Sequence, residues 1–338
     1  MHSLFGVENP LMDIVAHVDY AFLERFRKQA GTMHLVEHEE VRALLREIRS
    51  PRMVPGGSAA NTARGVAWLD RGGEARDRRP VDSERPVFNG AVGRDETGDE
   101  FVERLEAAGV SASIVRKDAP TGVSVILVTP DGERTMNTFL GACRSFEASD
   151  VDFDRLERSR MLYLTGYLWD TGNQRAAADS AAAFARSRAR RIPVAFDLAD
   201  PFAVRRFRDL FREWIPGRVD ILFGNRDELS LLTGAACDED CVARAAPFAP
   251  LVVMKIGEKG CLVGREGRCD HVPGLPVKAV DTTGAGDAFA AGFLHGMLRD
   301  LGPMESARIA NRIAARVVGN EGCCYEEDSG GVPPGSPS

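Results

Sequence analysis

The chain has 338 residues, of which 44% are hydrophobic and 28% charged, and this composition is typical of a globular protein with one large or two ordinary domains. Its formal net charge of −7 is opposite in sign to that of most nucleic-acid binders, so no nucleic-acid partner is expected. No apolar run approaches the ~20 residues that span a bilayer, and the start of the chain lacks a basic secretory signal. With seven cysteines, an odd number, these features predict reduced thiols, no membrane association and a cytoplasmic location.

Apolar runs alternate with segments of helical periodicity through the first 140 residues. The strand predictions depend on β-branched and apolar runs, and the predicted hairpin depends on two such runs around an Asp-Gly turn. In chain order the predicted elements are a strand at 4–18 that continues past an Asn-Pro break, helices at 19–29, 37–49 and 59–69, a strand at 87–92, a helix at 96–108 and a hairpin of 121–130 with 135–140.

From residue 150 the pattern becomes strand then helix, repeatedly, which indicates βαβ units and a parallel sheet covered on both faces. Strands are predicted at 161–165, 193–197, 221–224 and 251–256, and helices at 173–190, 226–233 and 241–246. The charged stretch 76–85 is predicted to be a surface loop, and the Gly-, Pro- and Ser-rich residues 328–338 a disordered tail. Since no interdomain linker is evident, residues 1–338 are expected to form one domain.

The strongest chemical signal is the string Asp281-Thr282-Thr283-Gly284-Ala285-Gly286-Asp287 before a small-sided helix. Small residues allow a loop to turn tightly into a helix, and the first N–H groups of a helix form an anion site. Asp287 falls in the first turn, where a carboxylate can accept a proton from an attacking hydroxyl. The alternative is a tight turn followed by a carboxylate that caps the helix.

Three further motifs lie at the start of a predicted helix or at the end of a predicted strand. In Gly56-Gly57-Ser58-Ala59-Ala60-Asn61, paired glycines allow a close approach of backbone to ligand; the alternative is a helix start capped by Ser58. Asn225-Arg226-Asp227-Glu228 follows a strand, at the edge of a parallel sheet where ligands bind, although acidic helix starts are common. Lys255-Ile256-Gly257-Glu258-Lys259-Gly260 is either a nucleotide-side turn or a simple turn between strands.

Taken in order, these motifs resemble those of the ribokinase/PfkB carbohydrate kinases, over residues 3–326. The stretches 6–13, 219–225 and 321–324 look similar to the adenosine kinase-like branch of that family. The resemblance implies an α/β fold of three layers, with a central, mainly parallel sheet flanked by helices. It also implies a small β lid formed from residues 14–55 and 119–140, which would exclude water from the site.

The resemblance further implies roles for single residues. Asp287 would be the catalytic base, aided by the backbone N–H groups of Gly284, Ala285 and Gly286 and by the lid arginine Arg134. Substrate contacts would come from Asn9, Asp13, Gly56, Gly57, Ser58 and Asn61, and a base pocket from Leu11, Leu35, Met136, Leu140 and Phe202. Nucleotide contacts would come from Asn225, Glu228, Lys255, Gly257, Gly260, Thr282 and Asn311, with threonine commoner in the family than lysine at 255.

The expected cofactors are ATP and Mg²⁺, the latter held through water by Asn225 and Glu228; a further need for K⁺ is left open. The expected acceptor is the 5′-hydroxyl of a nucleoside, with adenosine first, although Met33 replaces a polar residue common in adenosine kinases. The alternatives are a kinase for a free sugar such as ribose or fructose, and a silent nucleotide-binding regulator. The motifs are shared by monomers and homodimers, so either state is compatible with the sequence.

Overall fold

A computed structural model describes residues 1–73, 85–320, 323 and 325 of the chain. Within these residues, the larger of two sheets has nine strands in the order β14-β13-β12-β11-β10-β9-β1-β5-β6. All neighbours from β12 to β6 are parallel, and β13 and β14 add an antiparallel hairpin at one edge. The strands are β1 (Phe5–Val7), β5 (Val87–Gly93), β6 (Ser111–Lys117), β9 (Leu162–Thr165), β10 (Val194–Asp197), β11 (Ile221–Asn225), β12 (Leu251–Lys255), β13 (Gly260–Arg265) and β14 (Arg268–Pro273).

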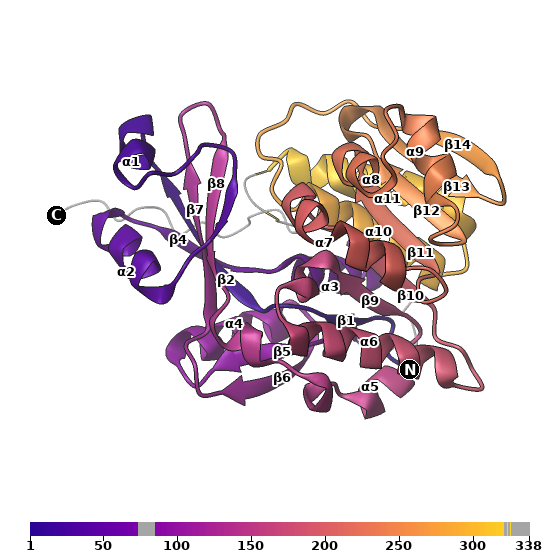
Figure 1. The fold of residues 1–338 in the computed structure, drawn as a ribbon, viewed down its shortest axis with the longest axis horizontal. Helices are drawn as coiled ribbons and strands as arrows, with labels where there is room; N and C mark the ends of the chain where they lie inside the picture. Colours follow the sequence, from indigo (N-terminus) through magenta and orange to yellow (C-terminus); the bar gives the residue numbers. More distant parts are fainter. Residues whose placement is uncertain (74–84, 321–322, 324, 326–338) are drawn as a thin grey trace.

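Helices cover both faces of this sheet, as Figure 1 shows. Alternate side chains of one strand enter different cores: Tyr163 joins one apolar cluster, and Leu162 and Leu164 join the other. The three-layer arrangement expected from the sequence is therefore confirmed. One face carries α3 (Ser58–Asp70), α4 (Glu96–Ala107), α10 (Ala285–Leu298) and α11 (Gly302–Val318), and the other carries α5 (Phe153–Glu157), α6 (Gly172–Ser187), α7 (Pro201–Trp214), α8 (Arg226–Thr233) and α9 (Asp238–Ala245).

A smaller sheet of five strands stands beside the larger one (Figure 1), in the order β3-β8-β7-β2-β4. Most of its residues come from the two segments, 14–55 and 119–140, that were predicted to form a lid, and residues 11–13 and 56 extend it. One face packs against α1 (Tyr20–Arg25) and α2 (His38–Glu47), through buried apolar side chains of both helices. The strands are β2 (Leu11–His17), β3 (Met33–Leu35), β4 (Arg52–Gly56), β7 (Gly122–Val128) and β8 (Arg134–Phe139).

The single strand predicted at 4–18 is wrong in one respect, because it forms two strands that belong to different sheets. β1 pairs with β5 and β9 of the larger sheet, whereas β2 pairs with β4 and β7 of the smaller one. The interruption lies at Asn9-Pro10, where proline has no N–H to donate to a strand neighbour. The break carries the chain from one sheet to the other.

The predicted elements otherwise match the observed helices and strands to within a few residues at each end, but several elements were not predicted. These are α5, α7, α11, β3, β4, β6, the β13–β14 hairpin and four short 3₁₀ helices, η1 (Gly141–Ser145), η2 (Ala148–Asp150), η3 (Gly166–Trp169) and η4 (Gly257–Lys259). The predicted tail and all but the last residue of the predicted 76–85 loop lie outside the described residues. In the part of the chain that is described, no helix has the length and apolar character needed to cross a membrane.

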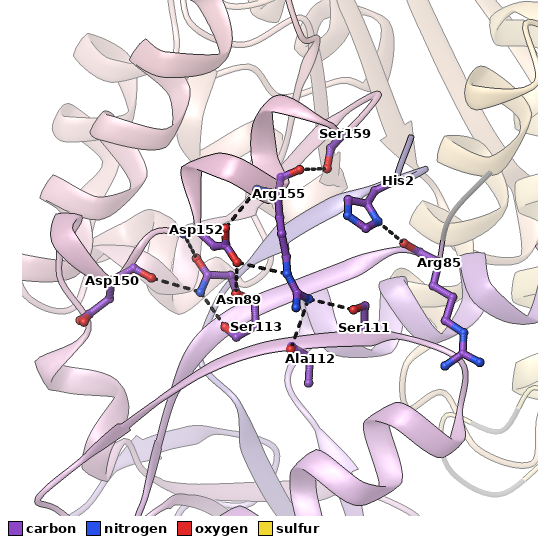
Figure 2. A network of polar contacts seen from close by, with 10 residues as sticks. All are labelled: His2, Arg85, Asn89, Ser111, Ala112, Ser113, Asp150, Asp152, Arg155 and Ser159. Carbon is purple, nitrogen blue, oxygen red and sulfur yellow. Dashed lines mark hydrogen bonds and ion pairs between the residues drawn. The ribbon is translucent and has the colours of Figure 1, made fainter.

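The edge strand β6 is fastened by a network of polar contacts (Figure 2). The buried amide of Asn89 donates to the carbonyl groups of Ser113 and Asp150, and its oxygen accepts from the N–H of Asp152. Arg155 of α5 donates to Ser111 Oγ at 2.8 Å. These contacts satisfy polar groups at the sheet edge, and the residues that make them do not line the cavity described below.

Candidate active site

A cavity of about 820 Å³ lies where the smaller sheet meets the larger one. It receives residues that directly follow, or end, the parallel strands β1, β9, β10, β11 and β12, which is the edge where open α/β sheets bind ligands. The predicted site residues that line it are Asn9, Leu11, Asp13, Leu35, Gly57, Ser58, Asn61, Arg134, Met136, Leu140, Asn225, Glu228, Lys255, Gly257, Gly260, Thr282, Gly284, Ala285, Gly286, Asp287 and Asn311.

The N-terminus of α10 opens into this cavity. Its N-cap is Gly284, whose φ of +70° is left-handed and whose added Cβ would lie 2.4 Å from that of Cys323, so only glycine fits. The N–H of Ala285 donates to the carbonyl of Thr282 at 3.2 Å. Of the three N–H groups expected to be bare, that of Ala285 is thus already bonded within the loop.

Asp287 is held by two residues of α3. Ser58 Oγ donates to its Oδ1 at 2.7 Å, and Asn61 Nδ2 donates to its Oδ2 at 2.9 Å. Burial raises the pKa of Asp287, and the nearby charge of Asp197 adds to this; the two hydrogen bonds and Lys255 act in the opposite direction. The carboxylate is therefore fixed in orientation, and its basicity is greater than that of a solvated aspartate.

The second carboxylate of the predicted site is Asp13, on β2. Burial and the charge of Asp287 raise the pKa of Asp13 to about 7, against the opposing charges of Arg64 and Arg134. Gly56 does not line the cavity. It leaves room for Asp13 instead, because a Cβ at this position would lie 2.2 Å from the carboxylate.

Asn9 reaches the cavity, but both ends of its amide have protein partners. Its Nδ2 donates to the carbonyl of Tyr167 at 3.2 Å, and its Oδ1 accepts from Gln174 Nε2 at 2.5 Å. Because Asn9 is buried and doubly bonded, its side chain also orders the turn between the two sheets.

Asn225 and Glu228 form a capping box at the start of α8, with each side chain accepting from the other's backbone N–H. The pKa of Glu228 is raised to about 7, because burial and the charge of Asp197 outweigh the opposing charge of Lys255. Lys255 Nζ lies 2.8 Å from Asp197 Oδ2, and this ion pair is almost fully buried. Lys255 therefore lines the cavity as the partner of Asp197 in an ion pair, which the motif did not predict.

The remaining predicted residues form apolar walls of the cavity or bond to other parts of the protein. Leu35, Met136 and Leu140 line the cavity from the smaller sheet and the turn after it. Asn311 lines it from α11, with its Nδ2 bonded to the carbonyl groups of residues 272 and 273 in β14. Arg134 forms an ion pair with Asp281, in the loop before α10.

The placement predicted for Phe202 is wrong. This residue belongs to α7, whose N-cap Asp200 accepts from the Phe202 N–H. Its ring lies beneath the guanidinium of Arg206, 5.0 Å from the ring centre, and is not part of the cavity lining. The prediction failed because helix α7 was not foreseen, and its register decides where the ring lies.

Several cavity residues were not predicted. Glu8 immediately precedes the predicted Asn9, and Asp170 and Asp200 follow β9 and β10 at the same edge of the sheet. An acid a few residues beyond a predicted strand was the available signal for Asp170 and Asp200. The polar pair Ser124 and Thr138, 3.0 Å apart on neighbouring strands, carried no motif.

Residues 31–329 match the model of the pfkB family of carbohydrate kinases. The chain belongs to this family. It is accordingly a phosphotransferase with an alcohol group as acceptor. Among solved structures, the chain is similar to the crystal structure of adenosine kinase from Sinorhizobium meliloti. The two sequences are 33% identical, and the structures superpose with a TM-score of 0.85 over 95% of each chain.

The names of two curated relatives give different acceptors. The adenosine kinase of Dictyostelium discoideum is 29% identical over 309 residues, covering 85% of each chain. The ATP-dependent ribose-1-phosphate kinase of Halopiger xanaduensis is 32% identical over 279 residues, covering 81% of this chain and 84% of its own. Membership of the family therefore does not by itself define the acceptor, which depends on the residues of the site.

Proposed function

We propose that this pfkB-family chain transfers the γ-phosphate of ATP to the 5′-hydroxyl of a nucleoside, with adenosine as the preferred acceptor and AMP and ADP as products. The observation that carries the proposal is a half-buried carboxylate, Asp287, at a helix N-terminus within a cavity that has two separate apolar groups of residues. The first group, from the smaller sheet and the turn after it, is Met33, Leu35, Ile126, Met136 and Leu140; the second, from the segment after β14 and from α11, is Leu275, Val277, Ala279, Ala314 and Val318.

Two apolar groups are what two nucleobases require, one in the acceptor and one in the donor. Purine kinases among the relatives support adenosine in particular. A free sugar would need only the polar middle of the cavity, so the smaller sheet's apolar wall would have no partner.

In the proposed reaction the 5′-oxygen attacks the γ-phosphorus, the bond from that phosphorus to the β–γ bridging oxygen breaks, and the 5′-hydroxyl proton passes to Asp287. The carboxylate accepts this proton as the new bond forms. The α10 N-terminus, with the N–H groups of Gly284 and Gly286, stabilises the charge on the transferred phosphoryl group. Arg134 approaches the same phosphoryl group from the smaller sheet.

Asp13, Gly57 and Asn61 are proposed to bind the ribose hydroxyls. Thr282, Gly257, Gly260 and Asn311 are proposed to bind the nucleotide. Carboxylate and amide oxygens suit Mg²⁺, and since no cluster of three ligands occurs among the described residues, Asn225 and Glu228 would hold the ion through water. Bound Mg²⁺ would supply charge neutralisation between the β- and γ-phosphates.

The charges in the cavity favour an uncharged acceptor. Its cationic lining residues are Arg134 and Lys255, and each is paired with an aspartate. Arg52 and Arg64, beside the Gly-Gly motif, do not line the cavity. A phosphorylated sugar would therefore lack a dedicated counter-charge at its far end.

The test is an ADP-release assay with MgATP, with and without KCl, against adenosine, inosine, guanosine, cytidine, ribose, fructose and ribose 1-phosphate. The proposal expects adenosine to have the highest kcat/KM. Turnover confined to a free sugar or to ribose 1-phosphate would keep the phosphoryl-transfer chemistry and refute the nucleoside. No turnover with any acceptor, despite ATP binding, would refute the kinase assignment for these substrates and favour a regulator.

A further inference from the structure

Helix α3, which carries Ser58 and Asn61, cannot cap its own N-terminus. Its N-cap is Gly57, which has φ +91° and makes no side-chain cap bond. A Cβ at this position would lie 2.6 Å from the carbonyl oxygen of Asn9, so a serine, threonine or aspartate cap is excluded by space as well as by backbone conformation. The first N–H groups of α3 therefore need an acceptor from elsewhere in the chain.

Glu8 is that acceptor. Its Oε2 accepts a hydrogen bond from the N–H of Ala59, and the N–H of Ser58 also bonds to this carboxyl group. Glu8 directly follows β1, is 3% exposed and lines the cavity. A side chain 51 residues away in sequence thus does for α3 what an N-cap normally does from within the helix.

The same helical turn holds Asp287. The side chains of Ser58 and Asn61, in the turn whose first N–H groups bind Glu8, donate to the two oxygens of that carboxylate. We propose that Glu8 is a positioning residue for phosphoryl transfer: it fixes the first turn of α3, and through Ser58 and Asn61 it fixes the orientation of Asp287. This rests on the proposed function, in which Asp287 receives the proton.

The ionisation of Glu8 predicts a pH dependence of kcat that a purely structural role for this residue would not produce. Burial raises the pKa of Glu8 to about 8, the charge of Asp287 adds to the rise, and the bonds from α3 oppose it. The other titratable groups that interact with Glu8 are Cys143, Tyr163 and Tyr167, whose raised pKa values keep them neutral. Near pH 7 Glu8 is mostly protonated, so glutamine closely imitates it.

The experiment compares Glu8→Gln and Glu8→Ala with the wild-type full chain, measuring kcat against pH from 5.5 to 9 and the dissociation constant of ATP by calorimetry. Glu8→Gln keeps the acceptor for Ala59, so its kcat at pH 7 should stay within about twofold of wild type. Glu8→Ala should lower kcat roughly 10- to 100-fold, the scale of a small misplacement of a reacting group. ATP affinity should change little in both.

Above pH 8 the wild-type kcat should fall, because ionised Glu8 places a second negative charge beside Asp287 and the phosphoryl group. Glu8→Gln should lack this fall. Ser159→Ala is the control, since it removes a buried hydroxyl that donates to the carbonyl of Arg155 outside the cavity; it should lower Tm and leave kcat unchanged.

The inference is overturned if Glu8→Ala turns over like wild type, if glutamine is no better than alanine, or if Glu8→Gln keeps the fall above pH 8. Should Glu8→Ala fail to fold, the glutamine variant and its pH profile decide alone. Failure of the proposed function would look different, because wild type itself would then not phosphorylate a nucleoside.

Discussion

Arg134 of the smaller sheet forms an ion pair with Asp281 of the loop that leads into α10. The pair joins the smaller sheet to the loop before α10, and Asp281 also accepts bonds from the N–H and hydroxyl of Thr283. Burial lowers the pKa of Arg134, but a guanidinium stays charged in this setting. A phosphoryl group at the α10 N-terminus would compete with Asp281 for this charge, which links nucleotide binding to the position of the smaller sheet.

Arg134→Ala should therefore lower kcat about 10- to 100-fold, because charge on the transferred phosphoryl loses a forked donor. Arg134→Lys should recover only part of this, since it restores the charge but not the fork. Steady-state kinetics with adenosine and MgATP provide the measurement. Arg94→Ala, which removes an exposed ion pair with Asp118, serves as the control, and equal kcat values for Arg134→Ala and this control would contradict the role.

Asp287→Asn should fold normally and lose turnover by roughly 10²- to 10⁴-fold, the usual contribution of a general base. Asparagine retains the size of the side chain and an oxygen that accepts from Ser58 or Asn61, so Tm and ATP affinity should be close to wild type. Rapid-quench measurement of one turnover separates the chemical step from product release. A variant that retains wild-type turnover would rule out Asp287 as the proton acceptor.

Lys255→Met should destabilise the protein by about 3–5 kcal/mol, because it leaves the buried carboxylate of Asp197 without its counter-charge. The double variant Lys255→Met/Asp197→Asn should regain part of that loss. Urea unfolding of wild type, Lys255→Met, Asp197→Asn and the double variant measures the coupling. If Lys255→Met unfolds at the wild-type urea concentration, then the ion pair contributes nothing to the free energy of unfolding.

The ligand-free protein should become less stable as pH rises from 5 to 8. Glu8, Asp13 and Glu228 have pKa values raised to about 8, 7 and 7, so the folded state binds these protons more tightly than the unfolded state does. Their contribution is complete below the ordinary carboxyl pKa and is lost as pH rises through the raised values. Asp95, whose pKa is lowered, acts only at more acidic pH.

The measurement is Tm by circular dichroism at constant ionic strength. Tm should fall between pH 5 and pH 8, and the fall should be smaller in Glu8→Gln, which has no proton to lose. A Tm that rises across this range would show that the pKa values of these carboxyl groups are not raised in the folded protein.

Local pattern was enough to predict much of the fold and part of the site. The alternation after residue 150 indicated parallel strands covered by helices, since periods of 2 and 3.6 are properties of neighbouring residues. Gly56, Gly57 and Gly284 marked helix starts, because left-handed backbone or close approach restricts these positions to glycine wherever they lie in the fold.

Other parts were decided only when distant segments met. The Asn-Pro break at residues 9–10 was visible in the sequence, but it did not show that the two parts of the strand would join different sheets. No local signal paired Lys255 with Asp197 or placed Phe202 on a helix that was not predicted. Glu8 had no predicted role because its partners lie some 50 residues away, and the contact from Ser58 to Asp287 spans 229 residues. Sequence periodicity encodes how each segment is shaped, whereas strand order and helix register, set by packing of the whole chain, determine which side chains share the buried cavity.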